Sequence, residues 1–196
     1  MSQSRDRVLT IPNLVSFLRL IGVGFFWWLL LSDRIAAAAW LIFIVGWTDW
    51  LDGYLARRLD QVSKLGAALD PIADRLMIIS AVVGGLMVGV IPTWIGIPLL
   101  AREALMALVT MRLVTGGHGV LEVRYVGKLA TFVLYGAIPS FYLAAAGVLP
   151  TLMRFLGWFF GVMGLVLYWY SAFGYIGDAR VAAAGVKSPD PEKRGE

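Results

Sequence analysis

The chain has 196 residues, of which 59% are apolar and only 15% are charged, against about 25% charged residues in an average soluble domain. Lysines and arginines number 17 and aspartates and glutamates 13, so the net charge is +4. This composition excludes a soluble globular enzyme, a disordered chain and a coiled coil, and it is typical of an α-helical integral membrane protein. With no cysteine and a single histidine, His118, the sequence also excludes disulfides, a thiolate nucleophile and a multi-histidine metal site.

Six stretches are long and apolar enough to cross a hydrocarbon core of about 30 Å. The Ile11-Pro12-Asn13 opening before the first of them fits either an amphipathic helix lying at the membrane interface or simply the start of that span. We predict an all-α fold, one bundle of six transmembrane helices over residues 1–177, followed by a polar cytoplasmic tail over 178–196. The predicted spans cover roughly residues 14–31, 35–55, 65–89, 92–114, 125–148 and 151–174.

The basic residues are unevenly divided between the two sides of this bundle. The side that holds both chain ends receives 13 of the 17 lysines and arginines, whereas the other side receives only Arg34 and Arg154. Positively charged loops stay in the cytoplasm. We therefore predict a multi-pass protein of the cell membrane with both termini in the cytoplasm, and we expect its positive charge to reflect this orientation rather than a nucleic-acid partner.

Four carboxylates occupy unusual positions within the predicted spans. Asp49 and Asp52 lie near the end of the second span, and Asp70 and Asp74 lie near the start of the third. The spacings of three and four residues place each pair on one helix face, and a short loop makes the two spans antiparallel and adjacent. The four side chains can therefore converge at the cytoplasmic end of the bundle.

A carboxylate at the centre of a membrane helix costs about 2.5–3.5 kcal/mol, so such a cluster needs compensation. Hard divalent cations prefer carboxylate oxygens, and a pair of them would clamp a phosphate or diphosphate group at the membrane surface. The alternative is a cation or proton transporter that uses the same aspartates.

The aspartates belong to a longer pattern. Written with its gaps, the segment resembles the signature of the CDP-alcohol phosphatidyltransferase family at all eight fixed positions, Asp49-x2-Asp52-Gly53-x2-Ala56-Arg57-x8-Gly66-x3-Asp70-x3-Asp74. The likeness extends to the Ile11-Pro12-Asn13 opening and to the segment Tyr125-Val126-Gly127-Lys128, so it covers most of the chain.

The resemblance implies a six-helix membrane enzyme, usually a homodimer, that transfers a phosphatidyl group from a CDP-linked lipid such as CDP-diacylglycerol to an alcohol and releases CMP. By position, Asp49 and Asp70 would bridge two Mg²⁺ or Mn²⁺ ions, with Asp52 completing the first site and Asp74 the second. Asp74 would also be the general base. The residues that would contact the CDP-lipid are Asn13, Gly53, Ala56, Arg57, Ser63 and Gly66.

Two positions that are basic in one branch of the family, but not in this chain, bear on which alcohol is the acceptor. Two branches of the family resemble the chain most: one uses glycerol 3-phosphate, and the other uses phosphatidylglycerol and makes cardiolipin. The first usually has an arginine and a lysine where this chain has Thr110 and Ala130. A site with fewer basic residues suits phosphatidylglycerol, which carries a single negative charge, and we expect this lipid to be the acceptor. Glycerol 3-phosphate is the alternative, and inositol phosphate is a third candidate.

Three basic residues are candidate acceptor contacts, Arg102, Arg124 and Lys128. For Arg124 and Lys128 the alternative role is as anchors in the positive cytoplasmic face. Arg102 lies deeper in its span, where it could instead pair with Glu103 or with an aspartate of the cluster.

Overall fold

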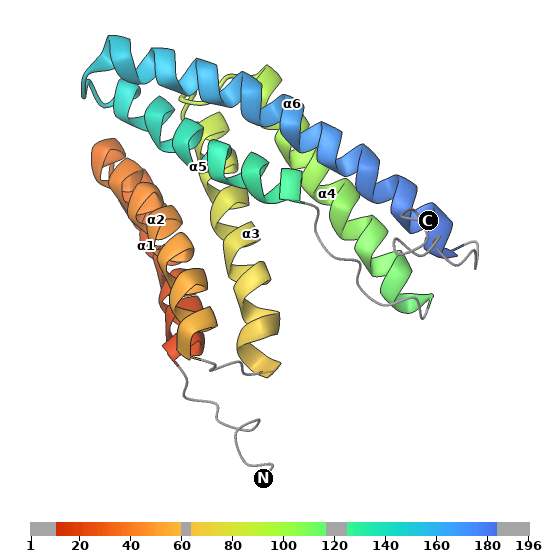
Figure 1. Ribbon diagram of the computed structural model, residues 1–196. Helices are drawn as coiled ribbons and strands as arrows, with labels where there is room; N and C mark the ends of the chain where they lie inside the picture. The colour runs from red at the N-terminus through yellow and green to blue at the C-terminus, as the bar shows by residue number, and fades with distance from the viewer. Residues whose placement is uncertain (1–10, 60–63, 117–124, 184–196) are drawn as a thin grey trace.

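The computed structural model of the chain describes residues 11–59, 64–116 and 125–183. All regular secondary structure in these ranges is α-helical, as expected, and it forms six helices (Figure 1). They are α1 (Ile11–Leu31), α2 (Ile35–Leu59), α3 (Lys64–Met87), α4 (Thr93–Thr115), α5 (Tyr125–Ala145) and α6 (Pro150–Ala183).

Each predicted span coincides with one helix, and the main differences lie at helix ends. α1 is continuous from Ile11, so the Ile11-Pro12-Asn13 opening is the first turn of this helix rather than a separate helix before it. α6 runs past the predicted span end at residue 174 to Ala183, through residues 178–183, where we expected the polar tail to begin. The reason is tertiary: Ala172, Tyr175 and Ala179 form a buried face, spaced by three and four residues, that packs with α4.

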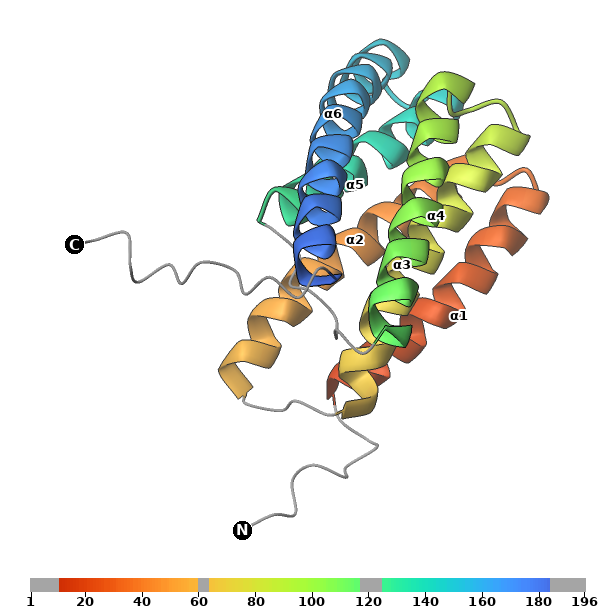
Figure 2. The same cartoon turned by 90° about the vertical axis from the view of Figure 1, so that its right-hand side faces the viewer.

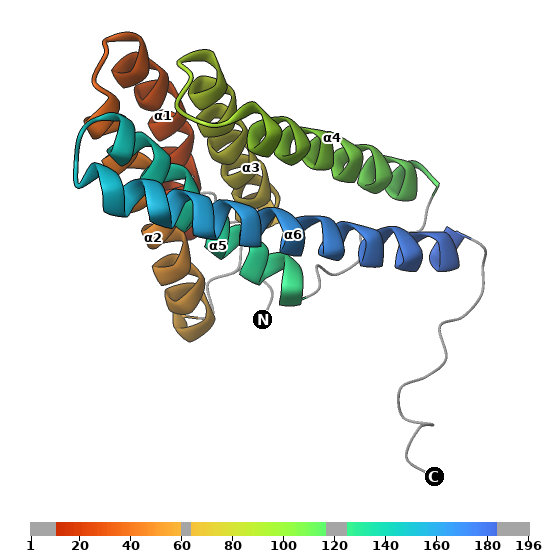
Figure 3. The ribbon, with the colours of Figure 1, turned by 90° about the horizontal axis from the view of Figure 1, so that it is seen from above.

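The hydrophobic core has two parts. The larger part contains buried residues from all six helices, and in it the hydroxyl of Tyr142 on α5 donates a 2.7 Å hydrogen bond to the carbonyl oxygen of Ala81 on α3. The smaller part joins the C-terminal halves of α4 and α6 through Met106, Leu113 and Tyr175. These halves run alongside each other and extend beyond the remaining helices (Figure 3). The six helices therefore share one main core, and α4 and α6 extend from it as an elongated pair.

A close approach of α2 and α5 lies one helical turn before Asp49. Gly46 faces the ring of Tyr135, and a Cβ atom at position 46 would lie 2.3 Å from the ring carbon Cδ1. Non-bonded carbon atoms prefer separations of about 3.5–4.0 Å, so a larger residue would push the two helices apart. Glycine at position 46 thus sets the spacing of α2 and α5 next to the acidic end of α2.

The outward faces of the helices are strongly apolar. Phe155, Phe159 and Phe173 all project from α6 with more than half of their surface exposed. Within the described residues one helix, Pro150–Arg180, is long and apolar enough to cross a membrane by length and composition alone, and shorter apolar stretches cover Phe17–Leu31, Ile35–Gly46 and Leu129–Ala145. An extended apolar exterior is typical of a surface that meets lipid or another protein.

Candidate active site

The four aspartates lie on helix ends that share one end of the bundle. Asp49 and Asp52 belong to the C-terminal part of α2, and Asp70 and Asp74 belong to the N-terminal part of α3. Figures 1 and 2 both place these two parts at the same end of the molecule, together with the start of α1. The expected antiparallel course of the two helices is therefore present. Of the four side chains, that of Asp74 is described, whereas for Asp49, Asp52 and Asp70 the structure describes the helical backbone but not the side chain.

The predicted adjacency of α2 and α3 at their acidic ends involves side chains that the structure does not describe. Within the described residues the two helices share no extensive contact, and α1 packs against both of them. The first helix is apolar around most of its circumference, including the buried Phe26 and Leu30, so it can bury surface on two neighbours at once. At the end of α3 that carries the aspartates, the described contact with α1 is the one between Arg19 and Asp74.

The other residues predicted from the sequence are placed only by their backbone. Asn13 lies in the first turn of α1, and Lys128 lies in the first turn of α5. Gly53, Ala56 and Arg57 lie on α2, and Gly66 lies on α3. The side-chain environments of these six lie outside what the structure describes, and Ser63 and Arg124 fall outside the described ranges altogether.

Asp74 is paired with an arginine that the sequence analysis did not assign to the site. Nη1 of Arg19, on α1, donates to Oδ1 of Asp74, and the two residues form an ion pair. The Arg19 side chain is only 2% exposed, and the Asp74 side chain is 27% exposed. One signal could have identified this residue: an arginine inside an apolar helix requires an anionic partner. By its position in the sequence, Arg19 is one of the 13 basic residues on the side that holds both chain ends.

Because this pair is largely buried, removing one partner should be costly. We expect Arg19→Gln to lower the free energy of unfolding by about 3 kcal/mol, the cost of leaving a buried charge uncompensated. For a chain of this size that corresponds to an unfolding temperature lower by about 10 °C, measured by thermal denaturation in detergent. Arg154→Gln, which removes an exposed arginine from α6, is the matched control. An Arg19→Gln protein as heat-resistant as this control would contradict the prediction.

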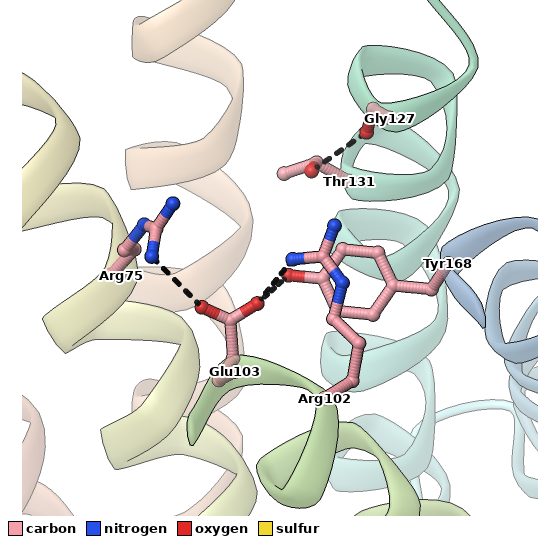
Figure 4. A network of polar contacts seen from close by, with 6 residues as sticks. All are labelled: Arg75, Arg102, Glu103, Gly127, Thr131 and Tyr168. Atoms are coloured by element: carbon pink, nitrogen blue, oxygen red, sulfur yellow. Dashed lines mark hydrogen bonds and ion pairs between the residues drawn. The ribbon is translucent and has the colours of Figure 1, made fainter. Parts of the chain in front are cut away.

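A second polar network joins α3, α4 and α6 (Figure 4). Glu103 is buried, and its Oε1 accepts a 2.8 Å hydrogen bond from Nη1 of Arg102 and a hydrogen bond from the hydroxyl of Tyr168. Its other oxygen, Oε2, lies 4.0 Å from Nη1 of Arg75. The guanidinium of Arg102 also lies over the Tyr168 ring, 3.7 Å from the ring centroid, as a cation–π contact. Of the alternatives considered for Arg102, pairing with Glu103 is the one observed.

The two networks meet on consecutive residues of α3. Neighbouring side chains on an α-helix point about 100° apart. Asp74 is therefore directed to Arg19 on α1, while Arg75 is directed to Glu103 on α4. Ion pairs thereby join α1, α3 and α4 at the level of Asp74, and Tyr168 adds α6 through its hydrogen bond to Glu103. From the sequence, Glu103 is a candidate partner of Arg102 alone, and Tyr168 has no assigned role, because nothing in their local pattern indicates which helix they face.

An apolar cavity of about 420 Å³ opens between α2, α5 and α6. Its walls include Phe43 and Gly46 of α2, Phe132 and Gly136 of α5, and Phe160 of α6. Gly46 lies one helical turn from Asp49, so the cavity begins near the acidic end of α2. A space of this size and polarity can accommodate part of a hydrocarbon chain.

Comparison with known proteins tests the resemblance seen in the motif. The sequence pattern of the CDP-alcohol phosphatidyltransferase family matches residues 9–170. Cardiolipin synthase (CMP-forming) of Streptomyces coelicolor is 40% identical over 182 residues, which cover 89% of this chain and 85% of that protein. A putative cardiolipin synthase of Mycobacterium tuberculosis is 37% identical over 169 residues, covering 84% of this chain and 80% of that protein.

A probable phosphatidylglycerophosphate synthase of Mycobacterium tuberculosis is 36% identical over 151 residues, covering 74% of this chain and 71% of that protein. The relatives therefore include both of the branches that the sequence analysis singled out. The matched range includes the whole aspartate motif and extends from the first helix into the sixth. This chain therefore belongs to the CDP-alcohol phosphatidyltransferase family.

Proposed function

We propose that this chain transfers the phosphatidyl group of CDP-diacylglycerol to phosphatidylglycerol, producing cardiolipin and CMP. The observation that carries the proposal is the likeness to a cardiolipin synthase over 89% of the chain at 40% identity, whereas a phosphatidylglycerophosphate synthase matches 74% at 36%. Transfer to glycerol 3-phosphate is the second candidate, because relatives of that kind also match.

The absence of basic residues at positions 110 and 130 supports phosphatidylglycerol as the acceptor. Ala130 is fully buried in the core, and Thr110 is partly exposed on α4, so neither position supplies a charge. A phosphate monoester carries close to two negative charges at neutral pH, and a phosphodiester carries one. We therefore assign the acceptor contacts to the three basic residues singled out from the sequence, Arg102, Arg124 and Lys128.

In the proposed reaction the acceptor hydroxyl oxygen forms a bond to the phosphorus that carries diacylglycerol. The bond from this phosphorus to the bridging diphosphate oxygen breaks, and its electron pair leaves with CMP. Asp74 takes the hydroxyl proton, as a general base must. Arg19 holds one oxygen of the Asp74 carboxylate, which fixes the direction in which the carboxylate faces the acceptor.

We further propose that Asp49, Asp52, Asp70 and Asp74 hold two Mg²⁺ or Mn²⁺ ions. The donor set fits these ions, because it consists of carboxylate oxygens on two helix ends at the same end of the bundle. Among the described side chains no three potential ligands gather, so the proposal depends on the quartet as a whole. When bound, such ions stabilise negative charge on the phosphate under attack and on the departing CMP.

The remaining contacts follow the family motif. Gly53 and Gly66 let the diphosphate and the cytidine approach the helix backbone closely, and Arg57 supplies a fork of donors for phosphate oxygens. Asn13, Ala56 and Ser63 complete the proposed CDP-lipid site. The apolar cavity that begins near Asp49 supports a substrate whose acyl chains lie among α2, α5 and α6.

A substrate with its acyl chains in lipid and its cytidine in water suits a multi-pass protein. We propose that the six helices cross the cell membrane, that both termini and the aspartates face the cytoplasm, and that the chain forms a homodimer. The apolar exterior of the helices and the uneven distribution of basic residues support this arrangement.

Parallel acceptor assays test the function. Purified protein in detergent, with CDP-diacylglycerol and Mg²⁺, is offered phosphatidylglycerol, glycerol 3-phosphate or inositol phosphate, and CMP and the lipid product are identified by mass spectrometry. We expect CMP and cardiolipin with phosphatidylglycerol. Phosphatidylglycerol phosphate formed from glycerol 3-phosphate alone would establish the second candidate, and the absence of CMP with every acceptor would refute the function.

A further inference from the structure

The network around Glu103 has more positive charge than its carboxylate balances. Arg75 and Arg102 share Glu103, and among the described residues no other carboxylate contacts either arginine. The three charges therefore sum to +1. Arg102 and Glu103 are buried and neutralise each other, so the excess positive charge lies on Arg75, whose side chain is 41% exposed and within reach of an anionic ligand. The imbalance indicates an anion site.

Arg102 has donors available for such an anion. Its guanidinium is held from two directions, by Glu103 through Nη1 and by the Tyr168 ring through its face. Its Nε is buried and has no hydrogen-bond partner among the described residues. A planar guanidinium presents five N–H donors in a rigid fork that matches phosphate oxygens. The structure thus holds an arginine in a defined orientation with part of its donor set unused.

We propose that Glu103 and Tyr168 are positioning residues that orient Arg102, and that Arg102 and Arg75 together bind the phosphate-ester anion of the acceptor. This inference rests on the proposed function and extends it. Arg75 directly follows Asp74, and consecutive Cα atoms lie 3.8 Å apart, so the base for the acceptor hydroxyl and a cation for the acceptor phosphate come from adjacent positions of α3. The anion is a phosphate ester of glycerol, supplied either by phosphatidylglycerol or by glycerol 3-phosphate.

Tyr168→Phe isolates the positioning role, because it keeps the ring beneath Arg102 and removes only the hydroxyl that donates to Glu103. We expect the KM for the acceptor to rise about tenfold, the effect of one lost hydrogen bond to a charged group, with kcat and the KM for CDP-diacylglycerol within about twofold of wild type. Tyr170→Phe, an exposed tyrosine on the same helix, is the matched control and should match wild type. An unchanged acceptor KM in Tyr168→Phe would overturn the proposal.

A double-mutant cycle separates positioning from a general structural role. Arg102→Lys keeps the charge but loses the fork and the stacking on Tyr168. If Tyr168 acts through Arg102, adding Tyr168→Phe to Arg102→Lys should raise the acceptor KM by less than about twofold further. An equal factor in both backgrounds would mean that Tyr168 acts independently and would refute the positioning role.

Arg75→Gln keeps the proposal testable if the buried variants fail to fold, because the Arg75 side chain is 41% exposed. We expect a severalfold higher acceptor KM with an unchanged KM for CDP-diacylglycerol, and an unchanged acceptor KM would remove Arg75 from the site. Each variant is assayed in parallel with phosphatidylglycerol and with glycerol 3-phosphate. The acceptor whose KM rises in the variants is the source of the anion. If wild type releases no CMP with either acceptor, the proposed function fails; an active wild type with unresponsive variants refutes only this inference.

Discussion

Replacing Asp74 by asparagine is expected to reduce the rate of CMP release by about 10²–10⁴-fold, the usual contribution of a positioned general base. Asparagine has nearly the same shape as aspartate and keeps an oxygen that can accept the hydrogen bond from Arg19. It cannot take the proton from the acceptor hydroxyl, and it is a weaker ligand for a divalent cation. The loss should therefore appear mainly in kcat.

The same substitution also removes the charge that balances Arg19, so loss of activity must be separated from loss of folding. Thermal unfolding of Asp74→Asn with and without CDP-diacylglycerol makes this separation, because a bound ligand raises the unfolding temperature of a folded protein. Asp33→Asn is the matched control, since Asp33 is an exposed aspartate in the turn between α1 and α2. A folded Asp74→Asn protein that turns over as fast as this control would exclude Asp74 as the base.

Chelation of divalent cations is expected to abolish CMP release, and addition of Mg²⁺ or Mn²⁺ should restore it. Four carboxylates at one end of a bundle repel one another, and cations both relieve this repulsion and stabilise the charge that develops on the diphosphate. The measurement is CMP release after EDTA treatment and desalting. Protein treated with EDTA already saturated with Mg²⁺ is the control for direct effects of the chelator.

Binding of Mn²⁺ gives a second measurement that does not depend on turnover. Free Mn²⁺ has a sharp electron paramagnetic resonance signal, and the signal decreases when the ion binds to protein. We expect wild type to reduce this signal and Asp49→Asn to reduce it much less. Full activity after complete chelation, together with no Mn²⁺ binding by wild type, would exclude the two-metal proposal and leave the aspartates with another role.

The helices and the motif could be predicted because their signals are local. Each predicted span is a largely apolar stretch, and helix ends such as Leu31 and Met87 lie close to polar or glycine-containing breaks. The end of α6 could not be found in this way. Its last turns are held by Tyr175 and Ala179 packing with α4, a contact that hydropathy alone does not reveal.

The amino-acid sequence by itself determined six helices, the spacing of the aspartates and membership of the family, because these depend only on residue type and separation along the chain. The pairing of Asp74 with Arg19 and of Glu103 with Tyr168 was decided by the tertiary structure, since the partners are 55 and 65 residues apart. Which polar side chains meet inside a bundle depends on how each helix is rotated about its axis and which neighbours it packs against. These contacts are therefore determined by the packing of all six helices together.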